Sequence, residues 1–442
     1  MNHKNNLVKL SLFPQTAGIN DENHLTIGGC DTVELAAILG TPLYVFDEAT
    51  LRSKCVEYRQ EFSQRYPNTE AIYACKAFIN PALALLLQEE GLGLDVVSAG
   101  EISIARSVAF PPERVYFHGN NKTQEELELA LDWGTGRIVV DNFHELSLLG
   151  RLTEQRSTVQ DILLRLSPGV DPHTHSYTTT GVLDSKFGFP IITGQAEEAL
   201  IRAIASASLN LIGLHFHLGS PVFETKPYVE AVEIALRFAA EMRQKHDFEL
   251  KELSIGGGFA IQYLLDSPAP PTGSYAEAIV STLLDQSGKL ELATPRLIIE
   301  PGRGIVGQAG VALYRMGGAK DIPGIRKYVF VDGGMGDNIR PPLYGSKYEA
   351  LLANKAGEEE TGQVTVAGKF CESGDILIRD VFLPKVDEDD ILAVPACGAY
   401  CLPLASNYNA CLRPAIVLVK DGQARLIRRR ETYEDLTRCD LF

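Results

Sequence analysis

Ile72-Tyr73-Ala74-Cys75-Lys76-Ala77-Phe78 is a short apolar run that carries a lysine near its end. Such a run is typical of a fully buried strand. An ammonium group at the end of a buried strand is costly unless it is paired or used in chemistry. The alternative interpretation of Lys76 is a side chain whose amine reaches solvent along the protein surface. The chain that follows this run favours the first interpretation.

After Lys76 the sequence alternates strand patterns with helix patterns. Eight strands are predicted, at residues 71–75, 93–97, 114–117, 137–141, 161–166, 211–217, 252–255 and 296–300. The helical patterns cover residues 81–90, 99–109, 123–133, 143–154, 195–207, 226–246 and 275–284. Eight parallel strands, each followed by a helix, are the number that closes a (β/α)8 barrel. A doubly wound open sheet is the structural alternative.

Polar side chains and glycines lie at or just past the C-terminal ends of the predicted strands. They are Lys76, Ser98 with Gly100 and Glu101, His118 with Gly119 and Asn120, Asp141 with Asn142, Arg165, His217, Gly256-Gly257-Gly258 and Glu300. Barrel enzymes place their chemistry at this face of the fold. The position of these residues therefore favours an α/β fold built on a TIM-like barrel.

The pattern changes after Arg303. Strands are predicted at residues 328–332, 363–370, 391–395, 415–420 and 423–428, separated by Gly, Pro and Asp-Gly turns. We therefore predict a barrel domain at 48–303, followed by a C-terminal mostly-β domain at 304–442. Residues 1–47 form an N-terminal segment that partly contributes to the β domain. Its strand at 41–47 could belong to either domain.

Length and composition limit the class of protein. A chain of 442 residues is too long for one ordinary domain, and a hydrophobic content of 45% is that of a globular protein. The formal charge of -16 argues against nucleic-acid or anionic-membrane partners. Eight scattered cysteines, with no CxxC pair, fit a reducing compartment. Without a signal-peptide pattern or a long apolar run, we expect a cytoplasmic location.

Two glycine-containing motifs follow the last two predicted barrel strands. Gly256-Gly257-Gly258 lacks Cβ atoms, so backbone N–H groups can approach a phosphate closely, although an ordinary tight turn is the alternative. Glu300-Pro301-Gly302-Arg303 adds an acid and a fork-shaped cation that suits a phosphate or carboxylate. Glu300 could simply pair with Arg303. Phosphate binding near the last two strands is usual in this fold.

Other candidate residues come from later motifs. The alternation in Leu214–Ser220 turns His215 and His217 to the barrel interior. A metal pair is one interpretation, but the sequence offers no further ligand set, and we predict no metal and an aromatic ring stacked on His217.

Cys371 is followed by Glu372 in a turn. A lone cysteine is usually a packing residue, but its pKa also suits proton donation. Arg340, Tyr344 and Tyr400 could bind anions.

Together these motifs resemble the fold-type III pyridoxal-phosphate decarboxylases, and most closely the diaminopimelate decarboxylases. The matching stretches are YACKAF, LDVVSAGE, YFHGNNK, SPGVDPHTH, TGVLDSKFG, LHFHLGS, SIGGG, EPGR, VDGGMGDNIRPPLY, GKFCESGD, GAY, SNYN and RRET. The resemblance implies a barrel plus a β domain, with pyridoxal 5'-phosphate (PLP) as the cofactor. It also implies decarboxylation of meso-2,6-diaminopimelate to L-lysine and CO2, a carboxy-lyase step of lysine biosynthesis.

The resemblance also implies roles for single residues. Lys76 would form the Schiff base, Glu300 would face the pyridine nitrogen, and His217 would stack on the ring. The phosphate and the rest of the cofactor would be held by Ser220, Gly256, Gly257, Gly258, Gly302, Arg303 and Tyr400. The substrate-binding set would be Arg303, Arg340, Tyr344, Glu372 and Tyr400, with Cys371 as the proton donor. The family's active site is shared within a homodimer, with Cys371 and Glu372 from the partner chain.

Two departures and three rival functions accompany this resemblance. The family commonly has Leu-Gly-Ile where this chain has Phe259-Ala260-Ile261, and Gln where this chain has Pro221. One rival is a related decarboxylase acting on D-lysine, D-ornithine or a carboxylated polyamine. Another is a non-catalytic PLP-binding regulator, which retention of both Lys76 and Cys371 argues against. A racemase shares the domain plan, but the CESGD motif is not expected there.

Overall fold

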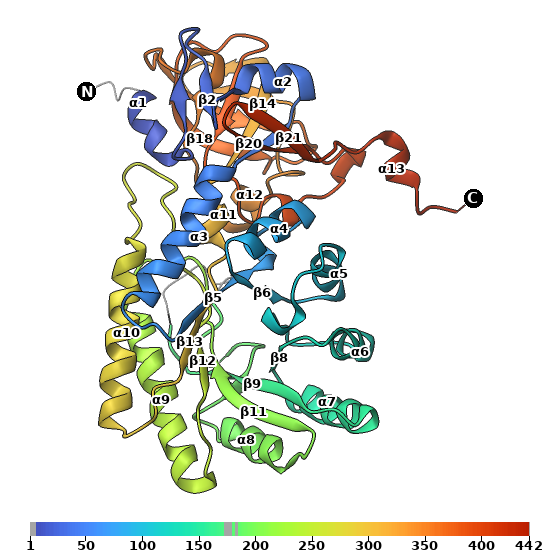
Figure 1. Cartoon of the computed structure of the whole chain (residues 1–442). Coiled ribbons are helices and arrows are strands. Elements are labelled where there is room, and N and C mark those ends of the chain that lie inside the picture. Colours follow the sequence, from blue (N-terminus) through green and yellow to red (C-terminus); the bar gives the residue numbers. More distant parts are fainter. Residues whose placement is uncertain (1–5, 172–178, 182–183, 442) are drawn as a thin grey trace. The chain divides into compact units, whose positions relative to one another are not determined.

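The computed structural model describes residues 6–171, 179–181 and 184–441. The predicted motifs at 167–175 and 180–188 therefore lie partly outside the described residues. The chain divides into two compact units, coloured along the sequence in Figure 1. Unit 1 comprises Met1–Lys54, Ile261–Ala269 and Arg303–Phe442, and unit 2 comprises Cys55–Ala260 and Pro270–Gly302. The domain boundaries at 47/48 and 303/304 stay a prediction. Residues 48–54 and 261–269 lie in unit 1.

Unit 2 is a closed parallel barrel. Its strands are β5 (Thr69–Ala74), β6 (Gly93–Val96), β7 (Val115–Phe117), β8 (Arg137–Val140), β9 (Gln160–Ser167), β11 (Leu209–His215), β12 (Glu252–Ser254) and β13 (Arg296–Ile299). Each strand pairs in parallel with the next, and β13 pairs with β5. The two-residue β10 (Phe189–Pro190) pairs with β9 outside this ring. The ring of eight strands therefore has no free edge, whereas an open doubly wound sheet would have two. The predicted barrel is confirmed.

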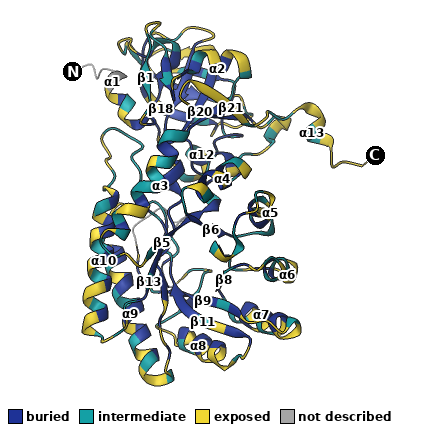
Figure 2. Cartoon of the chain, viewed as in Figure 1, coloured by how far each residue is buried: buried dark blue, intermediate teal, exposed yellow. Residues whose placement is uncertain are grey.

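Inward-facing apolar side chains fill the barrel. Ile72, Tyr116, Val139, Leu163, Ile212 and Ile298 form one buried cluster. Because side chains alternate along each strand, these residues share the interior while their neighbours face the surrounding helices. Figure 2 shows these strands as buried and the outer faces of the helices as exposed. The barrel interior is therefore a packed core, and the polar chemistry is confined to its ends.

The helices of unit 2 alternate with the strands along the chain. They are α4 (Pro81–Glu89), α5 (Ala99–Ser107), α6 (Gln124–Trp133), α7 (Phe143–Arg156), α8 (Gln195–Ala205), α9 (Lys226–His246) and α10 (Thr272–Lys289); α3 (Glu48–Ser63) precedes them in the chain. Side-chain oxygens of Asn80, Ser98, Thr123 and Asn142 accept backbone N–H bonds as N-caps of α4 to α7. Of the polar residues predicted at the strand ends, Ser98 and Asn142 therefore act as helix N-caps.

Unit 1 holds a mixed β-sheet. Its strands are β4 (Leu43–Asp47), β14 (Gly310–Ile322), β15 (Arg326–Val331), β16 (Leu351–Leu352), β17 (Gly362–Ala367), β18 (Ile376–Leu383), β19 (Ile391–Val394), β20 (Ala415–Lys420) and β21 (Gln423–Arg428). The main order is β18-β17-β15-β14-β4-β20-β21, with β19 joining β14 and β16. The predicted mostly-β C-terminal region is confirmed. β4 pairs with β14 and β20, which places this strand in the unit 1 sheet.

The remaining elements of unit 1 are short. A separate three-stranded sheet contains β1 (Gly18–Ile19), β2 (Leu25–Ile27) and β3 (Cys30–Asp31). The helices are α1 (Asn6–Lys9), α2 (Thr32–Leu39), α11 (Arg303–Val306), α12 (Arg340–Tyr344) and α13 (Tyr433–Thr437). Across the described ranges, no helix has both the length and the apolar character needed to cross a membrane.

A buried ion pair links the segment after β7 to the first turn of α7 and gives a stability prediction. Lys122 Nζ lies 2.7 Å from Glu145 Oε1, and both side chains are almost fully buried. Lys122→Met should lower the free energy of unfolding by about 3–5 kcal/mol, because it leaves the Glu145 charge buried without its partner. Urea denaturation followed by circular dichroism measures this change.

Two further variants control for the charge itself. The double variant Lys122→Met with Glu145→Gln should recover part of the loss, since no charge is then left unpaired. Lys289→Met removes the exposed partner of Asp285 and should cost less than about 1 kcal/mol. A Lys122→Met protein as stable as Lys289→Met would contradict the assignment.

Candidate active site

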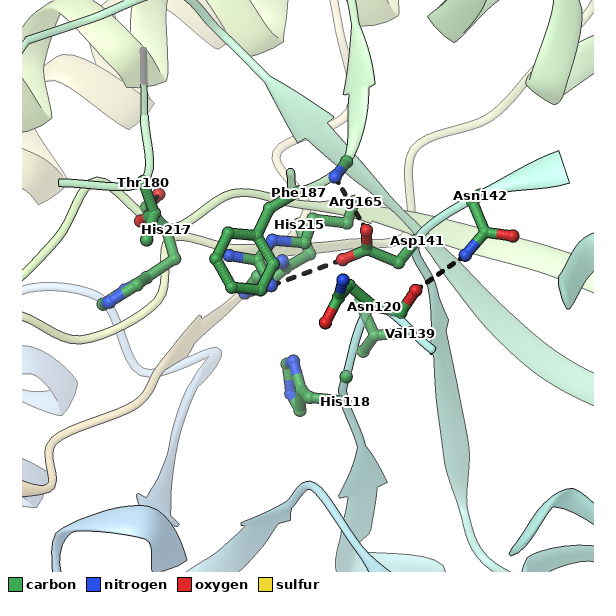
Figure 3. Close-up of polar contacts among 12 residues, drawn as sticks. His118, Asn120, Val139, Asp141, Asn142, Arg165, Thr180, Phe187, His215 and His217 are labelled. Carbon is green, nitrogen blue, oxygen red and sulfur yellow. Dashed lines mark hydrogen bonds and ion pairs between the residues drawn. The ribbon is translucent and has the colours of Figure 1, made fainter. Parts of the chain in front are cut away.

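The mouth of the barrel in unit 2 gathers functional side chains from all eight strands, several of which are drawn in Figure 3. In strand order from β5 they are Lys76, Asp95, His118, Asp141, Arg165, His215 with His217, Gly256–Gly258, and Glu300. Parallel strands carry their C-terminal ends to one face of a barrel, so residues distant in sequence meet there. The predicted Lys76, His217, the glycines and Glu300 all lie in this group.

Lys76 lies beside a buried carboxyl group. It follows β5 in a short 3-10 helix, η2 (Cys75–Ala77), and its Nζ is 3.6 Å from Asp95 Oδ2. Asp95 is 1% exposed, and neither of its side-chain oxygens has a hydrogen-bond partner in the described part of the chain. Burial raises the pKa of Asp95 to about 7, although the Lys76 charge opposes the shift. This carboxyl group can therefore exchange a proton near neutral pH.

Glu300 is the most strongly contacted carboxylate of the mouth. Ser254 Oγ donates a 2.7 Å hydrogen bond to Glu300 Oε1, and Nε2 of His215 lies 3.3 Å from the same oxygen. His118 Nε2 lies 3.4 Å from it on another side. Burial alone would raise the pKa of Glu300, but these imidazoles and the Lys76 charge hold it well below its usual range. Glu300 is therefore an ionised carboxylate in a buried site.

Burial and the charge of Glu300 act in opposite directions on the pKa values of the two histidines beside it. Burial is the main reason that the pKa of His118 lies well below its usual value, and burial also lowers the pKa of His215. Their ring centroids are 4.8 Å apart, with the rings at 68°. Ligand-type atoms of His118, His215 and Glu300 lie within 4.8 Å of one another, a spacing that could hold a metal ion. His118 joins this group in place of the predicted His217, and the absence of a metal stays a prediction.

His217 presents a neutral ring whose orientation is fixed by the glycine run. The backbone N–H of Gly257 donates a 3.2 Å hydrogen bond to His217 Nδ1, which assigns the ring proton to Nε2. Burial, with the charges of Lys76 and Arg165, lowers the pKa of His217 well below its usual value. A neutral, flat ring of this kind is suited to stacking on an aromatic ligand.

The three glycines are required by the close approach of neighbouring strand ends. A Cβ at Gly257 would lie 2.1 Å from the carbonyl oxygen of Glu300, and one at Gly258 would lie 2.2 Å from that of Gly219. A Cβ at Gly256 would lie 2.6 Å from His217 Nδ1. No side chain fits at these positions, so the backbone itself forms the surface of the mouth here. Their contact with a phosphate stays a prediction.

Two further predicted cofactor residues lie next to these elements. Ser220 comes three residues after His217 and is partly exposed. Gly302 follows β13, and a Cβ there would lie 3.0 Å from the side chain of Ala74 at the end of β5. Gly302 therefore permits the first and last barrel strands to approach each other, a packing role that the sequence did not predict.

Two arginines of unit 1 share one tyrosine. Arg303, at the start of α11, donates a 2.6 Å hydrogen bond to the Tyr263 hydroxyl, and its guanidinium carbon is 4.8 Å from the Tyr400 ring centroid. The guanidinium carbon of Arg340, at the start of α12, lies 4.9 Å from the Tyr263 ring centroid, and Arg340 also donates to the Tyr348 hydroxyl. Arg340 is buried and has no carboxylate partner among the described residues. Such a cation is suited to an anionic ligand.

Cys371 and Glu372 lie on an exposed turn of unit 1. The Tyr408 hydroxyl donates a 2.7 Å hydrogen bond to Glu372 Oε1, and the Cys371 N–H donates to Asn409 Oδ1 at 3.2 Å. The Cys371 side chain is exposed. The structure thus joins the CESGD and SNYN motifs, which the sequence alone could not connect. Tyr344, the last residue of α12, is the other predicted substrate residue of this unit.

Sequence reasoning did not give roles to several residues of the mouth. It placed His118, Asp141 and Arg165 at strand ends but did not choose them as site residues, and it overlooked Asp95. An aspartate inside the buried strand Gly93–Val96 was a signal for such a choice, because a carboxylate in an apolar strand needs a reason. Tyr263 and Tyr348 carried no comparable signal.

The departure at Phe259 proves to be a packing difference. Phe259 is 1% exposed, and its ring is stacked on Tyr228 at a centroid distance of 5.7 Å. The rings of Tyr275, Tyr58 and Phe62 surround it at 5.2–6.0 Å. The phenyl group therefore fills the core beneath the glycine run instead of facing the mouth.

Comparison with known proteins agrees with this geometry. The family model described as "Pyridoxal-dependent decarboxylase, pyridoxal binding domain" matches residues 49–307. A diaminopimelate decarboxylase of Bacillus subtilis is 47% identical over 426 residues, covering 96% of this chain and 97% of that protein. One of Halalkalibacterium halodurans is 46% identical over 429 residues, covering 97% and 98%.

Solved structures give the same result. A diaminopimelate decarboxylase from M. jannaschii in complex with L-lysine superimposes with a TM-score of 0.91 at 34% identity, covering 97% of this chain and 98% of that one. The Helicobacter pylori enzyme complexed with L-lysine gives a TM-score of 0.85 at 30% identity, covering 92% and 98%. This chain therefore belongs to the pyridoxal-dependent decarboxylases and, among them, to the diaminopimelate decarboxylase family.

Proposed function

We propose that this chain decarboxylates meso-2,6-diaminopimelate to L-lysine and carbon dioxide, with PLP as its cofactor. One observation carries the proposal: the identity of 46–47% to diaminopimelate decarboxylases extends over 96–97% of the chain. Two similar solved structures of that name hold L-lysine, which is the product of the proposed reaction. The PLP assignment follows from the pyridoxal-binding family model.

The residues of the barrel mouth fit this cofactor. Asp95 Oδ1 and Oδ2, His118 Nε2 and His215 Nδ1 are buried polar atoms without hydrogen-bond partners among the described residues. A buried polar atom of this kind is costly, and a polar ligand would relieve the cost. The side-chain-free surface at Gly256–Gly258 suits a phosphate, and the ionised Glu300 suits a protonated ring nitrogen.

We propose the following cofactor residues, with the chemistry that PLP supplies. They are Lys76, His217, Ser220, Gly256, Gly257, Gly258, Glu300, Gly302, Arg303 and Tyr400. When bound, PLP supplies an aldehyde that condenses with an amine and a pyridinium ring that accepts the electrons of the bond to the departing carboxylate. Lys76 holds the reactive amine beside Asp95, which can take or return a proton near neutral pH. Glu300 would keep the ring nitrogen of bound PLP protonated, and the neutral His217 would stack on the ring.

We propose a second set of residues for the substrate. Arg303, Arg340, Tyr344, Glu372 and Tyr400 would bind its polar groups. Arginines suit its carboxylates, since a guanidinium pairs with a carboxylate by two parallel hydrogen bonds. Glu372 suits its distal ammonium group. The Cys371 thiol would deliver the proton that replaces the lost carboxylate at Cα, because a positioned cysteine can act as a general acid.

We further propose a homodimer in which Cys371 and Glu372 complete the active site of the partner chain. The exposure of both side chains on one turn supports this arrangement, because a buried thiol could not reach another chain. We also propose a cytoplasmic location. The eight free cysteines support it, since thiols stay reduced in that compartment.

A substrate comparison tests the proposed reaction. Purified protein with PLP should release carbon dioxide from meso-diaminopimelate and form L-lysine, identified by mass and by chiral chromatography. D-Lysine, D-ornithine and a carboxylated polyamine should turn over at least about 10-fold more slowly, because they lack one of the charged groups that the site would bind. Faster turnover of any of these three would replace the substrate assignment.

The role of Lys76 predicts the effect of a single substitution. Lys76→Ala should lower the rate of carbon dioxide release by at least about 10³-fold, because no other amine is assigned to the cofactor. Lys245→Ala, which removes an exposed lysine of α9, should leave the rate within about twofold of the wild-type value. Full activity in Lys76→Ala would rule out its assigned role.

Cys371→Ala should lower turnover by about 10²-fold or more while PLP stays bound, since the thiol is assigned only to proton delivery. The shared active site gives a second readout. Equimolar Lys76→Ala and Cys371→Ala chains, mixed under conditions of subunit exchange, should regain up to about a quarter of the wild-type activity, because one site of each mixed dimer is intact. A mixture that stays inactive despite proven exchange would contradict the shared site.

A further inference from the structure

Asp141 follows β8 directly, and its buried carboxylate has two separate partners (Figure 3). Its Oδ2 lies 3.4 Å from a terminal nitrogen of Arg165 on β9. Its Oδ1 accepts a 2.8 Å hydrogen bond from the backbone N–H of Gly188, just before β10. One carboxylate therefore ties the guanidinium to the segment that leads into β10.

The same guanidinium also lies over the ring of Phe187. The guanidinium carbon of Arg165 lies 4.2 Å from the centroid of the Phe187 ring. Gly188 makes this approach possible, because its φ is +73° and a Cβ there would lie 2.8 Å from the Arg165 carbonyl oxygen. Arg165 is 7% exposed, so this cation–π contact is largely desolvated. Asp141 and Phe187 together fix the direction in which Arg165 points.

Arg165 lies opposite His215 in the pairing of β9 with β11, and the His215 ring contacts Glu300, but Arg165 itself does not pair with Glu300 or Asp95. Burial lowers the pKa of Arg165, and three carboxylates oppose this shift: Asp141, Glu300 and Asp95. Among the described residues, only Asp141 lies within ion-pair distance of the guanidinium. Arg165 thus acts on Glu300 and Asp95 through space without occupying their oxygens.

A guanidinium released from this position would find better partners. A charge-assisted pair with a buried carboxylate is strong, and its bidentate form is favoured by the planar fork of arginine. Pairing with Glu300 would occupy the carboxylate assigned to the ring nitrogen. Pairing with Asp95 would occupy the carboxyl group beside Lys76. Either pair would oppose cofactor binding.

We propose that Asp141 and Phe187 are positioning residues that hold the Arg165 guanidinium away from Glu300 and Asp95, so that both carboxyl groups remain open to the cofactor and to Lys76. This inference rests on the proposed function, because it assigns PLP to the barrel mouth. It adds two residues that act only through Arg165. Their loss should therefore matter only while the guanidinium is present.

A double-mutant cycle on cofactor affinity tests this dependence. The full-length protein is stripped of cofactor, and the PLP dissociation constant is measured by fluorescence quenching. Asp141→Asn keeps an acceptor for Gly188 and removes the charge that holds Arg165, so it should weaken PLP binding at least about 10-fold. In an Arg165→Gln background, the same substitution should change the dissociation constant by less than about threefold.

Matched variants separate positioning from a general structural effect. Asp161→Asn removes a carboxylate of β9 that pairs with a different arginine, Arg137, and should leave PLP affinity within about twofold. Phe187→Leu should weaken binding in the same direction as Asp141→Asn. An equal loss from Asp141→Asn in both backgrounds, or no loss from it, would overturn the proposal.

Two further outcomes of these binding and activity measurements have separate meanings. If Arg165→Gln binds no PLP, the guanidinium itself is required for cofactor binding, and the double-mutant cycle cannot be measured. Phe187→Leu then tests the proposal instead. A PLP dissociation constant of Phe187→Leu equal to that of the wild type would overturn the positioning role. A wild-type protein that binds PLP but leaves diaminopimelate intact would overturn the proposed reaction, while the comparison of dissociation constants among the variants would still test the positioning role.

Discussion

The closure of eight parallel strands is the constraint on which the barrel mouth depends. Because β13 pairs with β5, every strand delivers its C-terminal residue to the same small area. Carboxylates, imidazoles and cations from distant parts of the sequence are therefore buried together. Burial makes each uncompensated charge costly, so the residues there adjust one another's protonation. An open sheet could not impose this crowding, since its end strands would lie far apart.

The result is a site in which neighbouring groups are driven to different states. Glu300 stays ionised, because Ser254 and two imidazoles contact it. Asp95, which has no such donors among the described residues, has its pKa raised to about 7 by burial. Two carboxyl groups of the same barrel mouth thus have different chemistry. One suits a permanent countercharge, and the other suits proton exchange beside Lys76.

Much of this arrangement was predictable from sequence, for identifiable reasons. The barrel strands are continuous apolar runs followed by capping residues such as Ser98 and Asn142, and this pattern predicts a strand that turns into a helix. β14 was missed because its second half is charged and exposed, and β18 because charged residues interrupt its apolar pattern. β14 also pairs with β4 and β19, which are distant in sequence, and no local pattern reveals such pairing.

Predicting the site was easier for motifs than for contacts. Lys76, Glu300 and the glycine run stand out because lysine, glutamate and glycine are unusual at the end of apolar strands. The tie from Asp141 to Arg165 and Gly188 joins three places separated by up to 47 positions in the chain, so only the folded structure reveals it. The same holds for the contact between Glu372 and Tyr408, which links two motifs that are distinct in the sequence.

The central claim is that the amine at the end of β5 carries the cofactor. The most direct measurement is reduction of the PLP-loaded protein with borohydride, followed by peptide mapping by mass spectrometry. A pyridoxyl group on Lys76, and on no other lysine at stoichiometric level, is the expected result. A label on a different lysine, or a cofactor that is released unreduced, would contradict it.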